Sequence, residues 1–395
     1  MGQGPLAGVR VLDLTRLLPG PYAGQILVEL GADVIKIEEP GVGDYARAMA
    51  PLADGVGVVF QATNRGKRSV VLDLKQATGR EALLRLVDGA DILLEGFRPG
   101  TLARLGLGYE TLQTRNPRLI ICALTGYGQD GPYSQRAGHD LNYLGYSGLL
   151  SHLARPGSAP HVPGAQLADV AGGALMAVIG ILAALVGRGV TRRGQVVDVA
   201  MLDGSLALAP VLLATLNAGA PEVPPGGETL TGALPAYNIY ETADGQYVTL
   251  AALEPKFWAE FLRLAGRPDL IERHIPRDAE EAATTIAELA ALFRTRTRAE
   301  WLALLADADA CVGPVNTLTE ALADPQVRAR QIISGQDGPA PLLRATPLLS
   351  DNPLRALGPA PRLGEHTVAL LTEAGYTADE IAALLASGAA QAASA

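Results

Sequence analysis

Residues 9–39, VRVLDLTRLLPGPYAGQILVELGADVIKIEE, decide the fold. Within them, 9–14 is a short β-branched run, 20–30 has the apolar spacing of a helix that Gly31 ends, and 33–39 is a second strand. A strand, a helix and another strand in this order predict two parallel strands joined by a crossover helix. These residues therefore open an α/β domain, in which we expect a doubly wound, mostly parallel, Rossmann-like sheet.

The alternation of strands and helices continues along the chain. Strands are predicted at 69–74, 90–96 and 119–126, and helical stretches such as 79–87 separate them. Residues 194–219 read as one more strand followed by another helix, and a Pro- and Gly-rich break then places a domain boundary near residue 220.

The region after the break has a different pattern. Residues 237–253 are two strands around Ala-Asp-Gly, which is typical of a tight hairpin, and two stretches with helical spacing follow. Near the end, Thr377 and Glu380 stand in a capping-box arrangement ahead of an apolar run that Gly388 stops. The predicted organisation is a large α/β domain of 1–198 plus about 340–395, a small α+β domain of about 225–330, and linkers at 199–224 and 331–340.

The composition limits the class of protein. With 48% hydrophobic and 18% charged residues in 395, the chain is ordinary globular protein, and its formal net charge of −9 argues against nucleic acid as a partner. Cys122 and Cys311 lie far apart, and the five histidines are not at metal-ligand spacing, so we expect reduced thiols and no metal. The first residues lack the pattern of an export signal, which favours a cytoplasmic location.

One segment invites a membrane interpretation. Residues 170–187 are uncharged and close to the roughly 17–25 residues that a membrane helix needs. They are rich in Ala and Gly, lie between Asp169 and Arg188, and are followed by no clear second span. We therefore expect a buried helix in a soluble protein, with no membrane partner.

The first strand–helix–strand unit also invites a dinucleotide-binding interpretation. Glu38 and Glu39 end the second strand, where an acidic residue that binds a ribose would lie. The turn after the first strand, however, reads TRLLPGPYAGQ and has no GxGxxG, so no close glycine approach to a pyrophosphate is offered. The sequence argues against NAD or FAD.

Basic loops near predicted strand ends suggest an anionic ligand. Arg65, Lys67 and Arg68 surround Gly66 just before a strand, and Arg98 lies in another loop. Such loops suit a phosphorylated ligand, since Gly66 allows the backbone to approach it. Each group taken alone is equally well explained as solvated surface charge.

Three residues are candidates for proton transfer. His139 follows Gly138 and precedes a stretch that could open a helix, and a group that titrates near neutral pH at a helix start suits acid–base chemistry. The alternative is a histidine that supports a loop through a backbone hydrogen bond. Asp169 and Glu254 each precede a predicted helix, where capping would explain them as well as catalysis does.

Several blocks of sequence together resemble the family III CoA-transferases and, within them, the α-methylacyl-CoA racemase branch. Beyond residues 9–39, the blocks are NRGKRSVVLDLK, RPGTLARLGLGYETLQTRNPRLI, GYGQDGPYSQRAGHDLNY, GQVVDVAMLDG and DPQVRAR, which together run over nearly the whole chain. AGHDLNYL and EPKFW look like the racemase branch, because the transferases usually lack the histidine there.

The resemblance implies a mechanism. His139 and Asp169 would be the two acid/base groups that flank the α-carbon of a 2-methylacyl-CoA thioester, and Glu254 would hydrogen-bond the histidine. Inversion by proton exchange needs a base on one face and an acid on the other, and the amide of Asp140 at a helix start would hold the enolate oxygen. Gly138 would allow close approach, and Asn142 and Tyr143 would line the pocket. CoA would be part of the substrate, so no cofactor is expected.

The resemblance also leaves alternatives open. In the transferase branch the residue matching Asp169 is a nucleophile that forms an acyl anhydride and moves CoA between carboxylic acids. A third possibility is a CoA-thioester binding or scaffold protein that tolerates loss of His139 and Asp169. The family often has a CoA-contacting arginine where this chain has Glu39, which shifts phosphate binding onto Arg65, Lys67, Arg68 and Arg98.

The resemblance further implies the quaternary structure. Family members form an interlocked homodimer in which each chain threads through the other, so Glu254 would reach His139 from the second chain. The Pro-, Gly- and Ala-rich predicted linkers have the composition of such crossing segments. We therefore expect an interlocked homodimer that acts on acyl-CoA.

Overall fold

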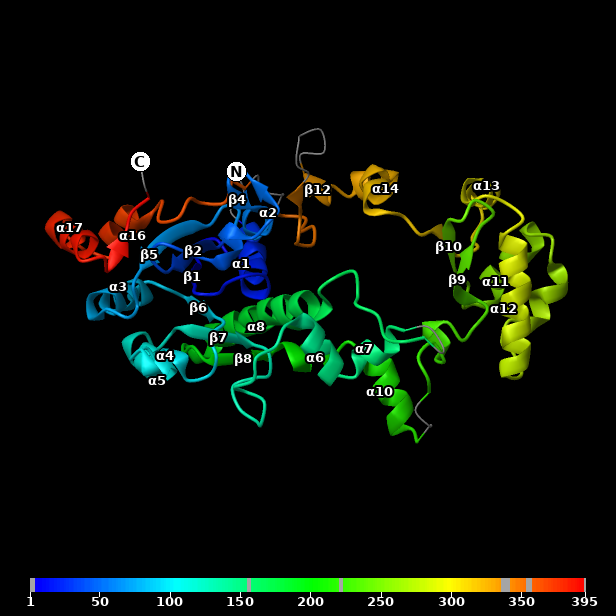
Figure 1. Ribbon diagram of the computed structural model, residues 1–395, viewed down its shortest axis with the longest axis horizontal. Helices are drawn as coiled ribbons and strands as arrows, with labels where there is room; N and C mark the ends of the chain where they lie inside the picture. The colour runs from blue at the N-terminus through cyan, green and yellow to red at the C-terminus, as the bar shows by residue number, and fades with distance from the viewer. Residues whose placement is uncertain (1–3, 155–157, 220–222, 335–341, 353–356, 394–395) are drawn as a thin grey trace. The chain divides into compact units, whose positions relative to one another are not determined.

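The computed structural model describes residues 4–154, 158–219, 223–334, 342–352 and 357–393 (Figure 1). The chain divides into two compact units. The larger unit comprises Met1–Ser147, Pro163–Ala209 and Ile332–Ala395, and the smaller comprises Gly148–Val162 and Pro210–Gln331. Each unit has an apolar core of its own.

A seven-stranded sheet, in the order β14-β5-β2-β1-β6-β7-β8, organises the larger unit. Strand β1 pairs in parallel with β2 on one side and with β6 on the other. Parallel pairing continues outward to β5 and β8, and β14 alone in this sheet runs antiparallel. The predicted mostly parallel α/β sheet is confirmed. The strands are β1 (Arg10–Asp13), β2 (Asp33–Glu38), β5 (Arg68–Leu72), β6 (Ile92–Glu95), β7 (Ile120–Thr125), β8 (Val196–Ala200) and β14 (Ala390–Gln391).

Helices cover both faces of this sheet, because alternate strand residues point to opposite sides and both sets are apolar. One face of the sheet packs against α3, α4, α5, α16 and α17. The opposite face packs against α1 and α8. Helices α16 and α17, from the end of the chain, lie beside α3 and β5 (Figure 1). The helices are α1 (Pro19–Glu29), α2 (Val58–Thr63), α3 (Ala77–Asp88), α4 (Thr101–Arg104), α5 (Tyr109–Arg115), α6 (Asp140–Tyr146), α8 (Met176–Thr191), α9 (Met201–Leu206), α16 (Thr367–Glu373) and α17 (Ala378–Ala386).

Short elements complete the larger unit. The crossover from β2 to β5 includes the 3₁₀ helix η1 (Tyr45–Ala48) and the two-stranded ribbon of β3 (Leu52–Ala53) and β4 (Val56–Gly57). A second ribbon joins β12 (Ile333–Ser334) and β13 (Leu342–Leu343). The capping box predicted for α17 is present, since Thr377 Oγ1 accepts from Glu380 N and Glu380 accepts in return from Thr377 N.

The predicted apolar helix at 170–187 consists of two consecutive segments, the π-helix η2 (Ala168–Leu175) and α8. Among the described residues, Ala168–Thr191 is the one segment long and apolar enough to cross a membrane, and 39% of its most apolar window is buried. The segment packs on β7, β8 and α1. The expected burial is therefore only partial, because one side of the segment packs on the sheet whereas Ile179, Val186 and Val190 are exposed.

A three-stranded antiparallel sheet, β11-β10-β9, organises the smaller unit. The predicted hairpin is confirmed: β9 (Tyr237–Glu241) pairs with β10 (Tyr247–Ala251) around Gly245, whose φ is +70°. Its core gathers Trp258, Phe261, Phe293 and Trp301. The other elements are α7 (Leu149–His152), α10 (Pro210–Asn217), η3 (Thr229–Thr231), α11 (Pro255–Leu264), η4 (Pro268–Arg273), α12 (Ala279–Phe293), α13 (Arg298–Leu304), β11 (Val312–Pro314), α14 (Leu318–Ala323) and α15 (Pro325–Ala329).

The two units divide the chain at other places than the predicted domains. Within the predicted linker 199–224, helix α9 packs on η2 in the larger unit, whereas α10 belongs to the smaller unit. Residues 148–162 also belong to the smaller unit. The backbones of α9 and η2 touch because both carry glycine at the contact: a Cβ on Gly204 would lie 2.0 Å from the carbonyl oxygen of Gly172.

Candidate active site

Two adjoining cavities lie at the carboxyl ends of the central strands of the larger unit. After β1 the strand order runs outward through β2 and β5 in one direction and through β6, β7 and β8 in the other. Parallel strands that diverge in this way leave a crevice at their carboxyl ends, which is the usual ligand site of such sheets. The larger cavity, of about 920 Å³, is lined by the loops after β1, β6 and β7, by the start of α6 and by Asp169. The smaller, of about 440 Å³, is lined by the ends of β2 and β5 and by α4.

His139 lines the larger cavity at the residue that precedes α6. Its extended backbone, with φ −132° and ψ 175°, places it just outside the helix, and its own N–H donates to Asn142 Oδ1 at 3.0 Å. The imidazole is exposed. The side chain that caps the helix start is therefore that of Asn142, and the histidine ring is left at the cavity.

Gly138 has a role that the sequence did not predict. We expected its small size to admit a ligand, and Gly138 does line the larger cavity, but the space beside its Cα is filled by aromatic side chains. A Cβ on Gly138 would lie 2.9 Å from Tyr127 Oη and 2.8 Å from the ring of Tyr143. Tyr143 Oη also donates to the carbonyl of Gly138 at 2.5 Å. The glycine thus lets two tyrosines pack directly behind His139.

These two tyrosines belong to a larger aromatic cluster. Tyr127 packs edge-on against Tyr133, Tyr143 and Tyr146, with ring centroids 5.9, 5.1 and 5.7 Å away. Such edge-to-face pairs are stabilising beyond their buried area. Burial raises the pKa of Tyr143 to about 12, so its hydroxyl stays protonated and keeps its donor role. The cluster holds the loop that ends in His139.

Asp169 lies on η2 and lines the same cavity as His139. Its backbone N–H donates to Asp140 Oδ1 at 2.9 Å, so the side chain of Asp140 ties the start of η2 to the start of α6. Burial, and next the charge of Asp140, raise the pKa of Asp169 to about 6, although His139 acts to lower it. A carboxyl with such a pKa can both give and take a proton near neutrality. The role expected for Asp140 was chiefly through its amide, and the structure adds one for its carboxylate.

Glu254 lies in the smaller unit, as the exposed residue that precedes α11. The start of α11 is set by Pro255 at its first position, where a missing N–H is harmless. The expected hydrogen bond between Glu254 and His139 remains a prediction.

The basic loop before β5 does not point into either cavity. Lys67 is 3% exposed, and its ammonium lies 2.9 Å from each of Asp13 Oδ2, Asn64 Oδ1 and the carbonyl oxygen of Pro21. Burial lowers the pKa of Lys67 to about 8, although Asp13 acts to raise it. An ammonium has three donors, and all three are used here. The expectation that Lys67 binds a phosphate is therefore wrong.

The neighbours of Lys67 are also engaged inside the larger unit. Arg68 pairs with Asp33 at 2.6 Å and with Glu373 at 2.7 Å, and Arg65 donates to the carbonyl oxygen of Leu343 at 2.8 Å. Neither arginine, nor Gly66, lines either cavity. These residues anchor segments from the end of the chain to the sheet instead of facing a ligand.

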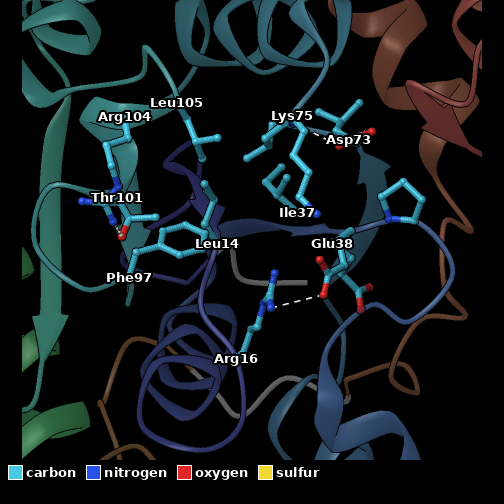
Figure 2. Close-up of a pocket in the computed structure, with 14 residues that line it drawn as sticks. Leu14, Arg16, Ile37, Glu38, Asp73, Lys75, Phe97, Thr101, Arg104 and Leu105 are labelled. Atoms are coloured by element: carbon cyan, nitrogen blue, oxygen red, sulfur yellow. Dashed lines mark hydrogen bonds and ion pairs between the residues drawn. The ribbon is translucent and has the colours of Figure 1, made fainter. Parts of the chain in front are cut away.

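Cations outside this loop line the two cavities. Arg98 lines the larger cavity, as does Arg136. Arg16 from the loop after β1, Lys75 from the turn after β5 and Arg104 from α4 line the smaller cavity, as Figure 2 shows. None of the three was predicted, although Arg16 and Lys75 follow the predicted ends of two parallel strands, where the fold places ligands.

Comparison with known proteins agrees with this architecture. The chain matches CoA-transferase family III over residues 6–367. Alpha-methylacyl-CoA racemase of Mus musculus is 40% identical over 381 residues, which cover 95% of each chain. Succinate–glutarate CoA-transferase of Agrobacterium fabrum is 37% identical over 388 residues, which cover 93% of this chain and 95% of that one. The crystal structure of a CAIB/BAIF family protein from Brucella suis has a TM-score of 0.82 at 35% identity and covers 94% of this chain and 100% of that one.

A deep cavity at the divergence of a parallel sheet, with a histidine and a titratable carboxyl at its wall, defines an α/β enzyme. Over almost its whole length the similarity is to enzymes named for acyl-CoA substrates, some of them racemases and some transferases. The chain belongs to CoA-transferase family III.

Proposed function

We propose that this protein is a racemase that inverts the α-carbon of 2-methyl-branched acyl-CoA thioesters. One observation carries the proposal: His139 and Asp169, on two different elements, line the same cavity, and the pKa of Asp169 is raised to about 6. Two proton carriers at one cavity suit a reaction in which the acid and the base exchange roles.

The proposed reaction is a 1,1-proton transfer. One of the two groups removes the proton from the α-carbon, and the electron pair of that C–H bond moves into the thioester to form an enolate. The other group then gives a proton to the opposite face of the same carbon. The products are the epimer and an enzyme whose two groups have exchanged protonation states, ready for the reverse direction. Both proton carriers are side chains, so the proposal needs no cofactor.

The amide of Asp140 supports the enolate in this proposal. Asp140 is the first residue of α6, and the first amides of a helix are not used by the helix itself. An amide aimed at a developing negative charge typically contributes about 3 kcal/mol to the transition state. The helix dipole adds to the same effect.

The shape and charge of the cavities support CoA as the carrier. Leu14, Arg16, Phe97 and Thr101 line both cavities, so the two are continuous. We place the phosphate-bearing nucleotide in the smaller cavity beside Arg16, Lys75 and Arg104, and the pantetheine arm along the shared wall, with the thioester at His139. Arginine and lysine are the usual partners of phosphate.

A homodimer remains part of the proposal. Helix α10 buries none of its side chains within the chain, and Val186 and Val190 of α8 are 77% and 85% exposed. Exposed apolar side chains of this kind favour contact with the surface of a second protein chain. A second copy would cover them and would bring its Glu254 to His139, as the family resemblance implies. We expect the dimer to act in the cytoplasm.

The proposal is tested by incubating one epimer of a 2-methylacyl-CoA with the protein in D2O, without any acceptor acid. We expect deuterium at C2 and loss of stereochemical purity, and His139→Ala should reduce both by about a hundredfold or more. The matched control is His161→Ala, because His161 is exposed and lies outside the cavities. Absence of exchange by the unaltered protein would refute the racemase.

A second candidate is a CoA-transferase with Asp169 as the nucleophile, and the similarity to a succinate–glutarate CoA-transferase favours it. In that reaction the carboxylate of Asp169 attacks the thioester, CoA leaves as the thiolate, and an acyl anhydride remains on the enzyme. Supplying free acids as acceptors distinguishes the two. Transfer that survives His139→Ala but is lost in Asp169→Asn, with no exchange at C2, would replace the racemase by the transferase.

A further inference from the structure

Arg16 lies where the two cavities meet, and its present partners are internal. Its side chain lines both cavities. The guanidinium lies 3.2 Å from Glu39 Oε1, donates to Tyr45 Oη at 2.7 Å, and lies 4.9 Å from the centre of the Tyr45 ring. Arg16 and Glu39 are both about one third exposed, at 30% and 33% of their side chains. The pair is thus within reach of any ligand that enters the smaller cavity.

A buried ion pair holds the backbone next to Arg16 in place. Lys36 and Asp44, with fully buried side chains, form an ion pair at 2.9 Å. Lys36 also donates to the carbonyl oxygen of Thr15, and Asp44 accepts from the amide of Leu17. The ion pair is therefore hydrogen-bonded to the backbone on both sides of Arg16. Leu17 has φ +68°, a conformation that a leucine keeps only when its surroundings impose it. The backbone on both sides of Arg16 is thus held by buried contacts, so a change of partner needs movement of the side chain alone.

The other carboxylates of the smaller cavity have structural partners. Glu38 accepts from Arg47 at 2.7 Å, from Ser69 Oγ and from the amide of Asp44. Asp73 accepts from the amide of Lys75 at 3.0 Å, which forms the turn after β5. Glu39 differs from both, since its ion pair is with a cation of the cavity itself.

We propose that Glu39 determines specificity by competing with the phosphate groups of the ligand for Arg16. The inference rests on the proposed placement of the CoA nucleotide in the smaller cavity. A phosphate at Arg16 shares the guanidinium with Glu39, and the nearby carboxylate repels the same phosphate. The penalty therefore grows with the charge of the ligand, so Glu39 lowers the affinity for CoA more than the affinity for 3′-dephospho-CoA.

Competition between Glu39 and the ligand phosphates for Arg16 would favour release of the product in the proposed reaction. Substrate and product carry the same nucleotide, so tighter binding there stabilises both equally and does not speed the chemical step. It would only slow release of the product. A carboxylate that weakens the nucleotide contact lets turnover proceed without altering the groups at the α-carbon.

The test is the affinity of the full-length protein for two ligands, measured by titration calorimetry at low salt. Glu39→Gln keeps the size of the side chain and an oxygen that can accept from Arg16, but removes the charge. We expect binding of CoA to tighten by about two- to fivefold, the range for one partly exposed charge, and binding of 3′-dephospho-CoA to tighten less. Glu110→Gln, an exposed glutamate on α5 outside both cavities, is the matched control and should change neither affinity.

A double-mutant cycle tests whether Glu39 acts through Arg16. Arg16→Gln should weaken CoA binding, and adding Glu39→Gln to it should then give less than about half of the gain seen in the parent. Equal gains for both ligands, an undiminished gain without Arg16, or no gain at all would each overturn the inference while leaving the proposed racemase intact. Failure of the unaltered protein to bind CoA would overturn both, so the two failures are told apart.

Discussion

The hydrogen bond between Asp140 and Asp169 gives a prediction about pH. Asp140→Asn keeps an oxygen that can accept the 2.9 Å hydrogen bond from the amide of Asp169, but removes a negative charge from its surroundings. The pKa of Asp169 is raised to about 6 first by burial and then by that charge. Without the charge the pKa should fall, and we expect a fall of roughly one unit, equivalent to about 1.4 kcal/mol.

The direction in which the pH profile moves follows from the protonation state that Asp169 needs in each direction of the racemisation. When Asp169 takes the proton, it must be ionised, so the acid limb of kcat/KM against pH lies near its pKa and should move to lower pH. When Asp169 gives the proton, it must be protonated, so in the opposite direction the alkaline limb that it sets should move to lower pH by the same amount. The shift of each limb is measured by deuterium incorporation at C2, starting from one epimer and then from the other.

Two controls separate this electrostatic effect from loss of structure. Asp140 is also an acid in the first turn of α6, where its removal costs about 0.3–1 kcal/mol, so urea unfolding at neutral pH must accompany the kinetics. Asp130→Asn changes an exposed aspartate that does not line the cavity, and should leave both limbs in place. A rate lowered equally at every pH, or limbs that move to higher pH, would refute the reasoning.

Three further predictions concern packing and buried charge. Lys67→Met leaves Asp13 buried without its partner and should lower the free energy of unfolding by about 3 kcal/mol in urea; a stable variant with only a raised KM would mean that Lys67 binds substrate after all. Gly138→Ala should lower kcat about tenfold because its Cβ would meet Tyr127 Oη at 2.9 Å, and Tyr127→Phe should restore part of the loss; no recovery would exclude this clash as the cause. Gly204→Ala should destabilise the fold by about 1–3 kcal/mol in urea, and an unchanged midpoint would show that η2 and α9 can separate without penalty.

The sequence predicted the framework of the larger unit because that framework depends on local patterns. The strands at Arg10–Asp13 and Asp33–Glu38, the helix between them and the capping box at Thr377 each follow from a few consecutive residues. Patterns of this kind carry their own physical cause, such as apolar periodicity or an orphan amide that needs an acceptor. They reveal which elements form, and the strand–helix–strand rule then gives the parallel pairing.

The burial of Lys67 could not be predicted, because burial of a charge is decided by residues that are distant in the sequence. A lysine after a glycine looks like a ligand-binding loop, but its acceptor Asp13 lies 54 residues earlier and is brought beside it by the sheet. The reason for a glycine at 138 was also not predicted, because the packing of the Tyr127 and Tyr143 rings against it depends on how the loop before α6 folds. Which cation faces a ligand is a property of the assembled sheet, not of its own loop.

The order of strands in that sheet also bears on the choice between the proposed reactions. The cations of the smaller cavity follow three strands: Arg16 comes after β1, Lys75 after β5, and Arg104 lies on α4 after β6. His139 comes after β7, and Asp169 lies on η2. If CoA is held as proposed, recognition of its nucleotide and reaction at its thioester are served by different residues. A racemase and a transferase could then share the nucleotide-binding residues and differ only at the start of α6. Substitutions at Glu39 should therefore change affinity under either reaction, whereas substitutions at His139 should decide which reaction occurs.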